Sequence, residues 1–162
     1  MWKITISTLI LVIIAVVLTI YRSPSSTPSE VAETESKRME AIATNLEVPW
    51  ALAFLPDKSI LITERVGRVR LINKDGKLQL NPIATINEVK QIGESGLHGV
   101  TIHPNFDNNH FVYFYYTYAG NGDTTLNRVS RFKLDDNNLT DEKIIVDQIP
   151  GAIFHDGGRI KF

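Results

Sequence analysis

The sequence predicts an all-β domain built from short strands, of the sandwich, barrel or propeller class. From Ile42 onward, short runs rich in β-branched and aromatic residues alternate with turn residues about every 8–12 positions. Residues 112–118 are apolar or aromatic on both faces, which indicates a strand covered on both sides, as in stacked propeller blades. The strand pair expected in residues 50–65 recurs in residues 99–114, at the ~50-residue spacing of four-stranded blades.

Residues 1–22 predict a transmembrane or signal helix. Residues 4–20 form an uncharged apolar run that would span roughly 25 Å as a helix, slightly less than a ~30 Å hydrocarbon core. The run is long for a signal peptide and lacks a small-x-small cleavage site, which favours an uncleaved signal-anchor over a cleaved, secreted form. Either alternative places the remaining chain outside the cytoplasm, in a periplasmic or extracellular compartment, and the anchor makes the membrane a partner.

Residues 23–41 predict a disordered tether, because a segment rich in Ser, Pro, Thr and Glu cannot bury enough apolar area to fold. The folded domain is then expected over residues 42–162. Its expected strands are residues 50–54, 59–64, 69–73, 83–86, 99–103, 111–117, 127–134, 143–149 and 159–162.

The composition limits the classes of function. Hydrophobic residues make up 43% and charged residues 22% of the chain, as in ordinary globular proteins. The formal net charge of −1 gives no electrostatic reason to expect a nucleic-acid partner. The chain has no cysteine, which excludes disulfides, thiolate metal sites and thiol nucleophiles.

Two glycine-rich turns carry the side chains suited to chemistry. Residues 93–99 read GESGLHG and run into an expected strand, and residues 155–159 read HDGGR and do the same. Glycines this closely spaced indicate a sharp turn, or a backbone that approaches another group where a Cβ would clash. We expect the domain to hold both turns on one face.

Five motifs, in order, resemble the quinoprotein glucose/sorbosone dehydrogenases, also called soluble aldose sugar dehydrogenases. They are residues 48–57, 61–69, 93–100, 103–106 and 155–160, and they are spread over about 115 residues. The resemblance implies a six-bladed β-propeller, of which this chain supplies the N-terminal two and a half blades. It also implies pyrroloquinoline quinone (PQQ) beside a calcium ion, a sugar substrate oxidised from aldose to lactone, and an external electron acceptor.

The resemblance further implies that His155 takes the proton from a sugar hydroxyl while hydride passes from the same carbon to the quinone. An imidazole suits this task because it is largely an unprotonated base at neutral pH. Glu94 is implied near the sugar and quinone, and Arg65, at a strand end within one of these motifs, is likewise implied near substrate and cofactor. The residues alone leave simpler roles open: His155 as a turn residue, Glu94 as an acceptor for nearby backbone N–H groups, and Arg65 as either a strand-end ion pair or an anion contact.

Other polar residues are expected to be structural. His103-Pro104 predicts a turn after a strand, and His98 either lines the cavity or replaces a packing residue. Residues 107–109 and 121–123 carry oxygen ligands without the ~12-residue spacing of an EF-hand loop, so turns are expected there. No metal ligand is predicted in this chain.

The resemblance also implies that later blades supply most of the groups that hold the quinone and calcium. We therefore expect a fragment that carries the base but is inactive as an isolated 162-residue chain, with residues 159–162 as an unpaired edge strand. Two alternatives remain. A propeller can serve as an extracellular binding domain, or it can be a calcium-dependent lactonase with acidic and amide ligands around a central metal.

Overall fold

The computed structural model describes residues 39–162. The helix expected in residues 1–22 and nearly all of the tether expected in residues 23–41 lie outside the described residues. Within the described part of the chain, no helix is both long and apolar enough to cross a membrane. Residues 39–48 precede the first strand and have no regular secondary structure.

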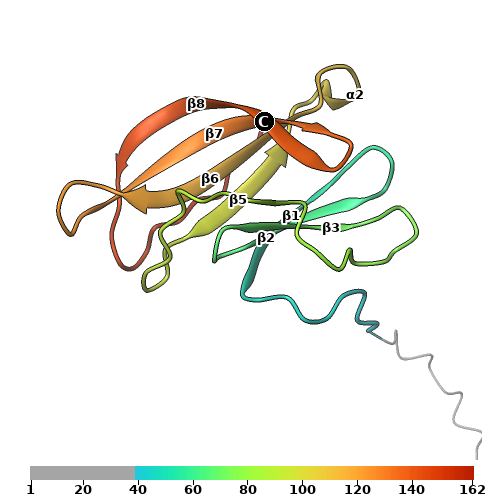
Figure 1. The fold of residues 1–162 in the computed structure, drawn as a ribbon, viewed down its shortest axis with the longest axis horizontal. Coiled ribbons are helices and arrows are strands. Elements are labelled where there is room, and N and C mark those ends of the chain that lie inside the picture. The colour runs from blue at the N-terminus through green and yellow to red at the C-terminus, as the bar shows by residue number, and fades with distance from the viewer. Residues whose placement is uncertain (1–38) are drawn as a thin grey trace, which may run out of the picture. The chain divides into compact units, whose positions relative to one another are not determined.

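The domain consists of two four-stranded antiparallel sheets, each with its strands in chain order (Figure 1). The first contains β1 (Pro49–Phe54), β2 (Ile60–Glu64), β3 (Arg68–Ile72) and β4 (Ala84–Thr85). The second contains β5 (Leu97–Ile102), β6 (Phe111–Ala119), β7 (Thr125–Asp135) and β8 (Asn138–Pro150), with the one-turn helix α2 (Phe106–Asn109) between β5 and β6. The prediction of an all-β domain is confirmed.

The two sheets repeat one another along the chain. β1 begins at Pro49 and β5 at Leu97, about 50 residues apart, and each is the first strand of its sheet. β1 pairs with β2 through registers such as Leu52↔Ile62, and β5 pairs with β6 through Val100↔Phe114. A four-stranded meander repeated at this period is the expected form of successive propeller blades.

The hydrophobic core lies between the two sheets, where β1 and β5 run side by side (Figure 1). Alternate residues of each strand face this layer because side chains alternate across a strand. The first sheet contributes Leu61, Val69, Leu71 and the adjoining Ile86, and the second contributes Leu97, Val100, Val112, Phe114, Tyr116, Phe132 and Leu134.

Strand β6 is covered on both faces, as its sequence predicted. Phe114 and Tyr116 are fully buried on the core side. On the other side, Tyr113 packs edge-on against Phe162 with ring centroids 5.1 Å apart, and the Tyr115 hydroxyl donates to the Asp156 carbonyl at 3.0 Å. The second cover is therefore an irregular segment after β8 rather than another sheet.

Two strand predictions differ most from the structure. Residues 159–162 form no strand, because no neighbouring segment among the described residues offers them a hydrogen-bonded ladder. β8 begins at Asn138, five residues before the expected start at Lys143. Its first residues are polar and mostly exposed, so the alternation that identifies a half-buried strand is absent.

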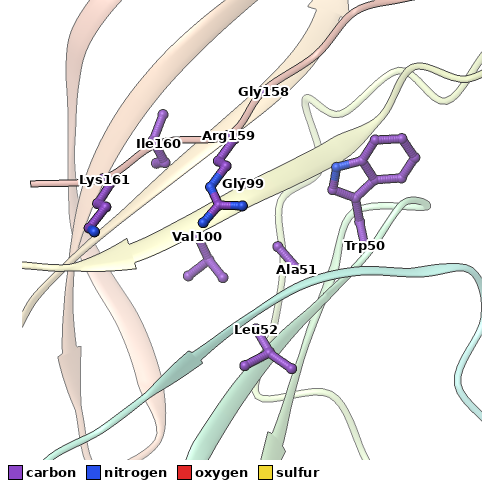
Figure 2. A pocket seen from close by; sticks show the side chains of 9 residues that line it. All are labelled: Trp50, Ala51, Leu52, Gly99, Val100, Gly158, Arg159, Ile160 and Lys161. Atoms are coloured by element: carbon purple, nitrogen blue, oxygen red, sulfur yellow. The ribbon is translucent and has the colours of Figure 1, made fainter.

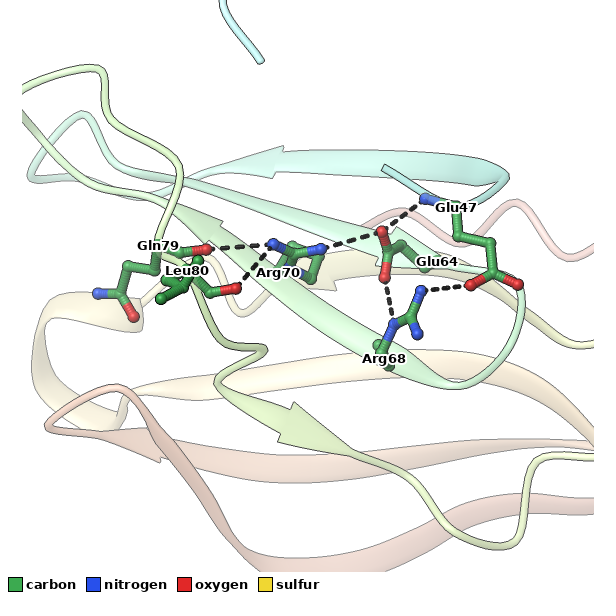
Figure 3. Close-up of polar contacts among 6 residues, drawn as sticks. All are labelled: Glu47, Glu64, Arg68, Arg70, Gln79 and Leu80. Atoms are coloured by element: carbon green, nitrogen blue, oxygen red, sulfur yellow. Dashed lines mark hydrogen bonds and ion pairs between the residues drawn. The ribbon is translucent and has the colours of Figure 1, made fainter. Parts of the chain in front are cut away.

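A buried carboxylate connects β2, β3 and the chain before β1 (Figure 3). Glu64 is fully buried and accepts from Arg68 Nε at 2.6 Å, from Arg70 Nη1 at 3.2 Å and from the Glu47 backbone N–H at 2.7 Å. Arg68 Nη2 also pairs with the Glu47 carboxylate at 2.7 Å. These bonds fasten the segment before β1 to the first sheet.

Candidate functional site

The structure brings the two glycine-rich turns together. The Glu94 backbone N–H donates to the Ile153 carbonyl at 2.9 Å, and the His155 backbone N–H donates to Glu94 Oε2 at 3.1 Å. We call this contact between the two turns the junction. His155 and Glu94 are both exposed, so their side chains face solvent there. The expectation that one face holds both turns is confirmed.

Arg65 lies beside the same junction. Its carbonyl accepts the Leu97 N–H at 2.9 Å, and a Cβ on Gly96 would overlap that carbonyl oxygen. Gly96 also has φ +149°, which L side chains rarely adopt. The turn therefore needs glycine at position 96 to let Arg65 approach, and all three site residues expected from the sequence lie around one junction.

The Arg65 guanidinium has no partner among residues 39–162. Its Nε is buried without a hydrogen bond, and no Asp or Glu of the described chain forms an ion pair with it. The strand-end ion pair expected as one alternative is absent from these residues. The other alternative, contact with an anion, stays a prediction.

Asp156 is a member of this site that the sequence analysis did not single out. It is 8% exposed. Its Oδ1 accepts the Ala152 N–H at 2.7 Å, and its Oδ2 lies 2.5 Å from Ser95 Oγ and 3.3 Å from Thr117 Oγ1. The sequence did show an acidic residue next to His155 in a recognised turn. Its partners Ser95 and Thr117 lie too far away in the sequence to be predicted from that motif.

His98 is a buried packing residue that connects the two sheets. Its ring stacks on Trp50 with centroids 4.3 Å apart and lies 6.2 Å from the Tyr115 ring. Nε2 lies 3.0 Å from the Glu94 carbonyl, which can only accept, so Nε2 carries the proton. Nδ1 is buried with no partner. Of the two roles expected for His98, the structure shows packing.

Burial lowers the pKa of His98, although its contact with the Glu94 carbonyl acts in the opposite direction. The unfolded chain therefore binds this proton more readily than the folded chain. The stability that neutral His98 contributes is fully present above about pH 6.5, the usual histidine value, and is lost as the pH falls toward the lower folded pKa.

We expect His98→Leu to weaken the pH dependence of stability between about pH 7 and 5, the range that begins just above the ordinary histidine pKa of about 6.5 and extends below it. Leucine fills the position without a titrating group. Thermal unfolding of both proteins across this range measures the effect: the melting temperature of the unmodified protein should fall further on acidification than that of the variant. Equal decreases would show that His98 does not titrate on unfolding.

His103 has a structural role away from this junction. Its Nδ1 accepts the Asn105 N–H at 3.0 Å and lies 2.8 Å from Asn109 Nδ2, which fixes the turn into α2. Residues 107–109 belong to α2 rather than to a simple turn, whereas residues 121–123 lie in the expected turn, which the Gly120 N–H closes by donating to the Thr124 carbonyl. No group of three or more metal-ligating His, Cys, Asp or Glu side chains occurs in residues 39–162.

A pocket of about 410 Å³ lies beside the inner strands of the two sheets (Figure 2). Figure 2 shows β1 residues on one side, the segment after β8 on the other, and β5 between them. The walls of the pocket combine the aromatic ring of Trp50 with the cationic side chains of Arg159 and Lys161. The lining residues are Trp50, Ala51, Leu52, Gly99, Val100, Gly158, Arg159, Ile160 and Lys161.

Comparison with known proteins gives one consistent result. Relatives include quinoprotein glucose dehydrogenase B of Acinetobacter calcoaceticus, 27% identical over 90% of this chain and 33% of its own length. Aldose sugar dehydrogenase of Escherichia coli is 32% identical over 76% of this chain and 34% of its own length. This chain thus spans about a third of the length of the curated relatives it matches.

Solved structures agree with the sequence relatives. The PQQ-bound aldose sugar dehydrogenase of Streptomyces coelicolor superposes with a TM-score of 0.66 at 28% identity, over 75% of this chain and 36% of that one. The soluble aldose sugar dehydrogenase of E. coli, in its apo-form, superposes with a TM-score of 0.70 at 30% identity, over 76% of this chain and 37% of that one. Residues 46–162 match the family described as Glucose / Sorbosone dehydrogenase, and the chain therefore belongs to the glucose/sorbosone dehydrogenase family.

Proposed function

We propose that the protein containing this chain is a PQQ-dependent dehydrogenase that oxidises an aldose to its lactone, with His155 as the base. One observation carries the proposal. In a chain of this family, His155 is exposed on a glycine-rich turn, and Glu94 of the other glycine-rich turn bonds to this turn through its carboxylate and its backbone N–H. An exposed histidine fixed through its backbone can present a free ring nitrogen to a substrate hydroxyl.

The residues at this junction fit an anionic quinone such as PQQ. Arg65 offers a cation without a partner among the described residues, and Arg159 and Lys161 add positive charge to the pocket that Trp50 lines. A Cβ placed on Gly157 would meet nothing within 4 Å, so the turn after His155 leaves room for a bound molecule. When bound, PQQ supplies a two-electron acceptor for hydride.

The chain's own residues then perform three tasks in the proposed reaction. The His155 ring accepts the hydroxyl proton as the sugar is oxidised. The Glu94 carboxylate holds the His155 backbone and thus the position of the base, and Arg65 balances negative charge near the turn. We assign no step to calcium, because residues 39–162 contain no cluster of side chains suited to hold it.

We also propose that residues 1–162 alone do not turn over sugar, because the family resemblance distributes the site over six blades and residues 39–162 form two sheets. The apolar run at residues 4–20 supports a location outside the cytoplasm, anchored to the membrane, with secretion after cleavage as the alternative. Recovery of the protein in the membrane fraction after salt washing would support the anchor, and recovery only in the soluble cytoplasmic fraction would contradict export.

The proposed function is tested by dye reduction with purified protein, PQQ, calcium and a panel of aldoses. We expect the protein expressed from its complete reading frame to reduce the dye only when both an aldose and PQQ are present. The isolated 162-residue chain should show no such activity. Hydrolysis of a lactone without aldose oxidation, or PQQ binding without oxidation of any aldose, would contradict the proposal.

A further inference from the structure

We propose that Asp156 is a positioning residue whose buried carboxylate clamps the turn that carries His155. This inference rests on the proposed function for its catalytic consequence, whereas the clamp itself is a property of the fold. The carboxylate joins three segments: the loop after β8, the turn before β5, and strand β6.

The turn has a backbone conformation that requires support. His155 has φ +64°, in the left-handed region that non-glycine residues adopt infrequently. Gly157 and Gly158, which follow Asp156, also have positive φ angles of 53° and 111°. Conformations of this kind persist when the surrounding structure fixes them. Asp156 lies within this strained segment and is its buried acidic side chain.

The Asp156 carboxylate makes contacts in two directions. Within the loop, Oδ1 accepts the Ala152 N–H at 2.7 Å and closes residues 152–156 on themselves. Across the site, Oδ2 meets the hydroxyls of Ser95 at 2.5 Å and Thr117 at 3.3 Å. Ser95 and Thr117 are both fully buried, so these contacts are shielded from water. The clamp therefore ties the His155 turn to the buried start of the second sheet.

The donor chemistry predicts which substitutions the clamp tolerates. The Ala152 N–H can only donate, so an oxygen must face it. The Ser95 hydroxyl can donate or accept, and it also lies 2.6 Å from the Ala152 carbonyl, which can take its proton. An asparagine at position 156 could thus direct its oxygen to Ala152 and its amide to Ser95. Alanine would leave the Ala152 N–H without its acceptor and would remove the link to Ser95, whose hydroxyl would keep the Ala152 carbonyl as its only acceptor.

The test compares Asp156→Ala, Asp156→Asn and Ser95→Ala with Asp123→Ala, which removes an exposed carboxylate on the β6–β7 turn. All variants are expressed from the complete reading frame and loaded with PQQ. Four quantities are measured: kcat per PQQ-loaded site, KM for the aldose, the melting temperature, and hydrogen exchange of the backbone amides in residues 151–158. If Asp156→Ala does not fold, Ser95→Ala tests the clamp instead, because it removes the hydroxyl that contacts the Asp156 carboxylate.

We expect Asp156→Ala to lower kcat per loaded site by about 10- to 100-fold, the scale of a small misplacement of a catalytic group. Exchange in residues 151–158 should rise while exchange in β5 stays unchanged. Asp156→Asn should recover most of both properties, and Asp123→Ala should alter neither. A general loss of folding would instead lower the melting temperature and the fraction of loaded sites without this selective decrease in kcat.

Two results would overturn the inference. Unchanged exchange in residues 151–158 of both Asp156→Ala and Ser95→Ala would show that no clamp exists, whatever the activity. Faster exchange with unchanged kcat would show that catalysis does not depend on the clamp. The proposed function is tested separately in the same assay by a His155 variant. Full activity of that variant would contradict the role of His155 as the base. The hydrogen-exchange result would then still show whether the clamp exists.

Discussion

His155→Asn is expected to lower kcat for aldose oxidation by about 10²- to 10⁴-fold, the range for loss of a general base. Asparagine tolerates the left-handed conformation of position 155, so the turn should keep its backbone bond to Glu94. Its amide cannot accept a proton from the sugar hydroxyl. The measurement is the initial rate of dye reduction at saturating aldose, divided by the amount of bound PQQ.

His110→Asn is the matched control for this variant. His110 also has a positive φ, 55°, and its side chain is 45% exposed in a surface pair with Asp135. The same substitution there removes an imidazole from a similar backbone conformation outside the candidate site. His110→Asn should retain the unmodified rate. A His155→Asn protein with that rate would show that another group accepts the proton.

Glu64→Gln is expected to lower the free energy of unfolding by about 3–5 kcal/mol, as for a buried ion pair broken on one side. The variant retains the size of the side chain but removes the charge that balances Arg68 and Arg70. Arg70 is the more affected partner, because its side chain is only 9% exposed. Chemical denaturation monitored by tryptophan fluorescence measures the change.

Glu47→Gln provides the comparison within the same network (Figure 3). It removes the carboxylate partner from Arg68 at the exposed end, where the Glu47 side chain is 56% exposed. An exposed pair of this kind contributes at most about 1 kcal/mol, so this loss should be much smaller. Equal losses for the two variants would contradict the central role of Glu64 in the network.

The sequence was informative about the fold wherever turn residues separated half-buried strands. The run at residues 50–72 predicted β1 to β3 closely, because each strand there has an apolar face against the core and a turn signal at its end. β8 was predicted too short because it lies at the edge of its sheet with nearly all side chains exposed. Residues 159–162 have a strand-like composition, but strand formation depends on a partner that composition does not specify.

The candidate site was predictable to the extent that local motifs reveal it. Glycine spacing identified both turns, and the family resemblance implied the role of base for His155, which stays a prediction. The contacts of Asp156 could not be read from the sequence, because Ser95 lies 61 residues away and their contact depends on how the loop after β8 folds back. The lack of an acidic partner for Arg65 among residues 39–162 likewise emerged only from the structure.

The most direct test of the account uses an aldose deuterated at C1 in the dye-reduction assay, with the protein expressed from its complete reading frame and loaded with PQQ. If hydride leaves C1 while His155 accepts the hydroxyl proton, the deuterated sugar should be oxidised more slowly and the product should be the lactone without deuterium at C1. Turnover at the same rate with deuterium retained in the product would contradict oxidation at this carbon, and with it the role given to His155.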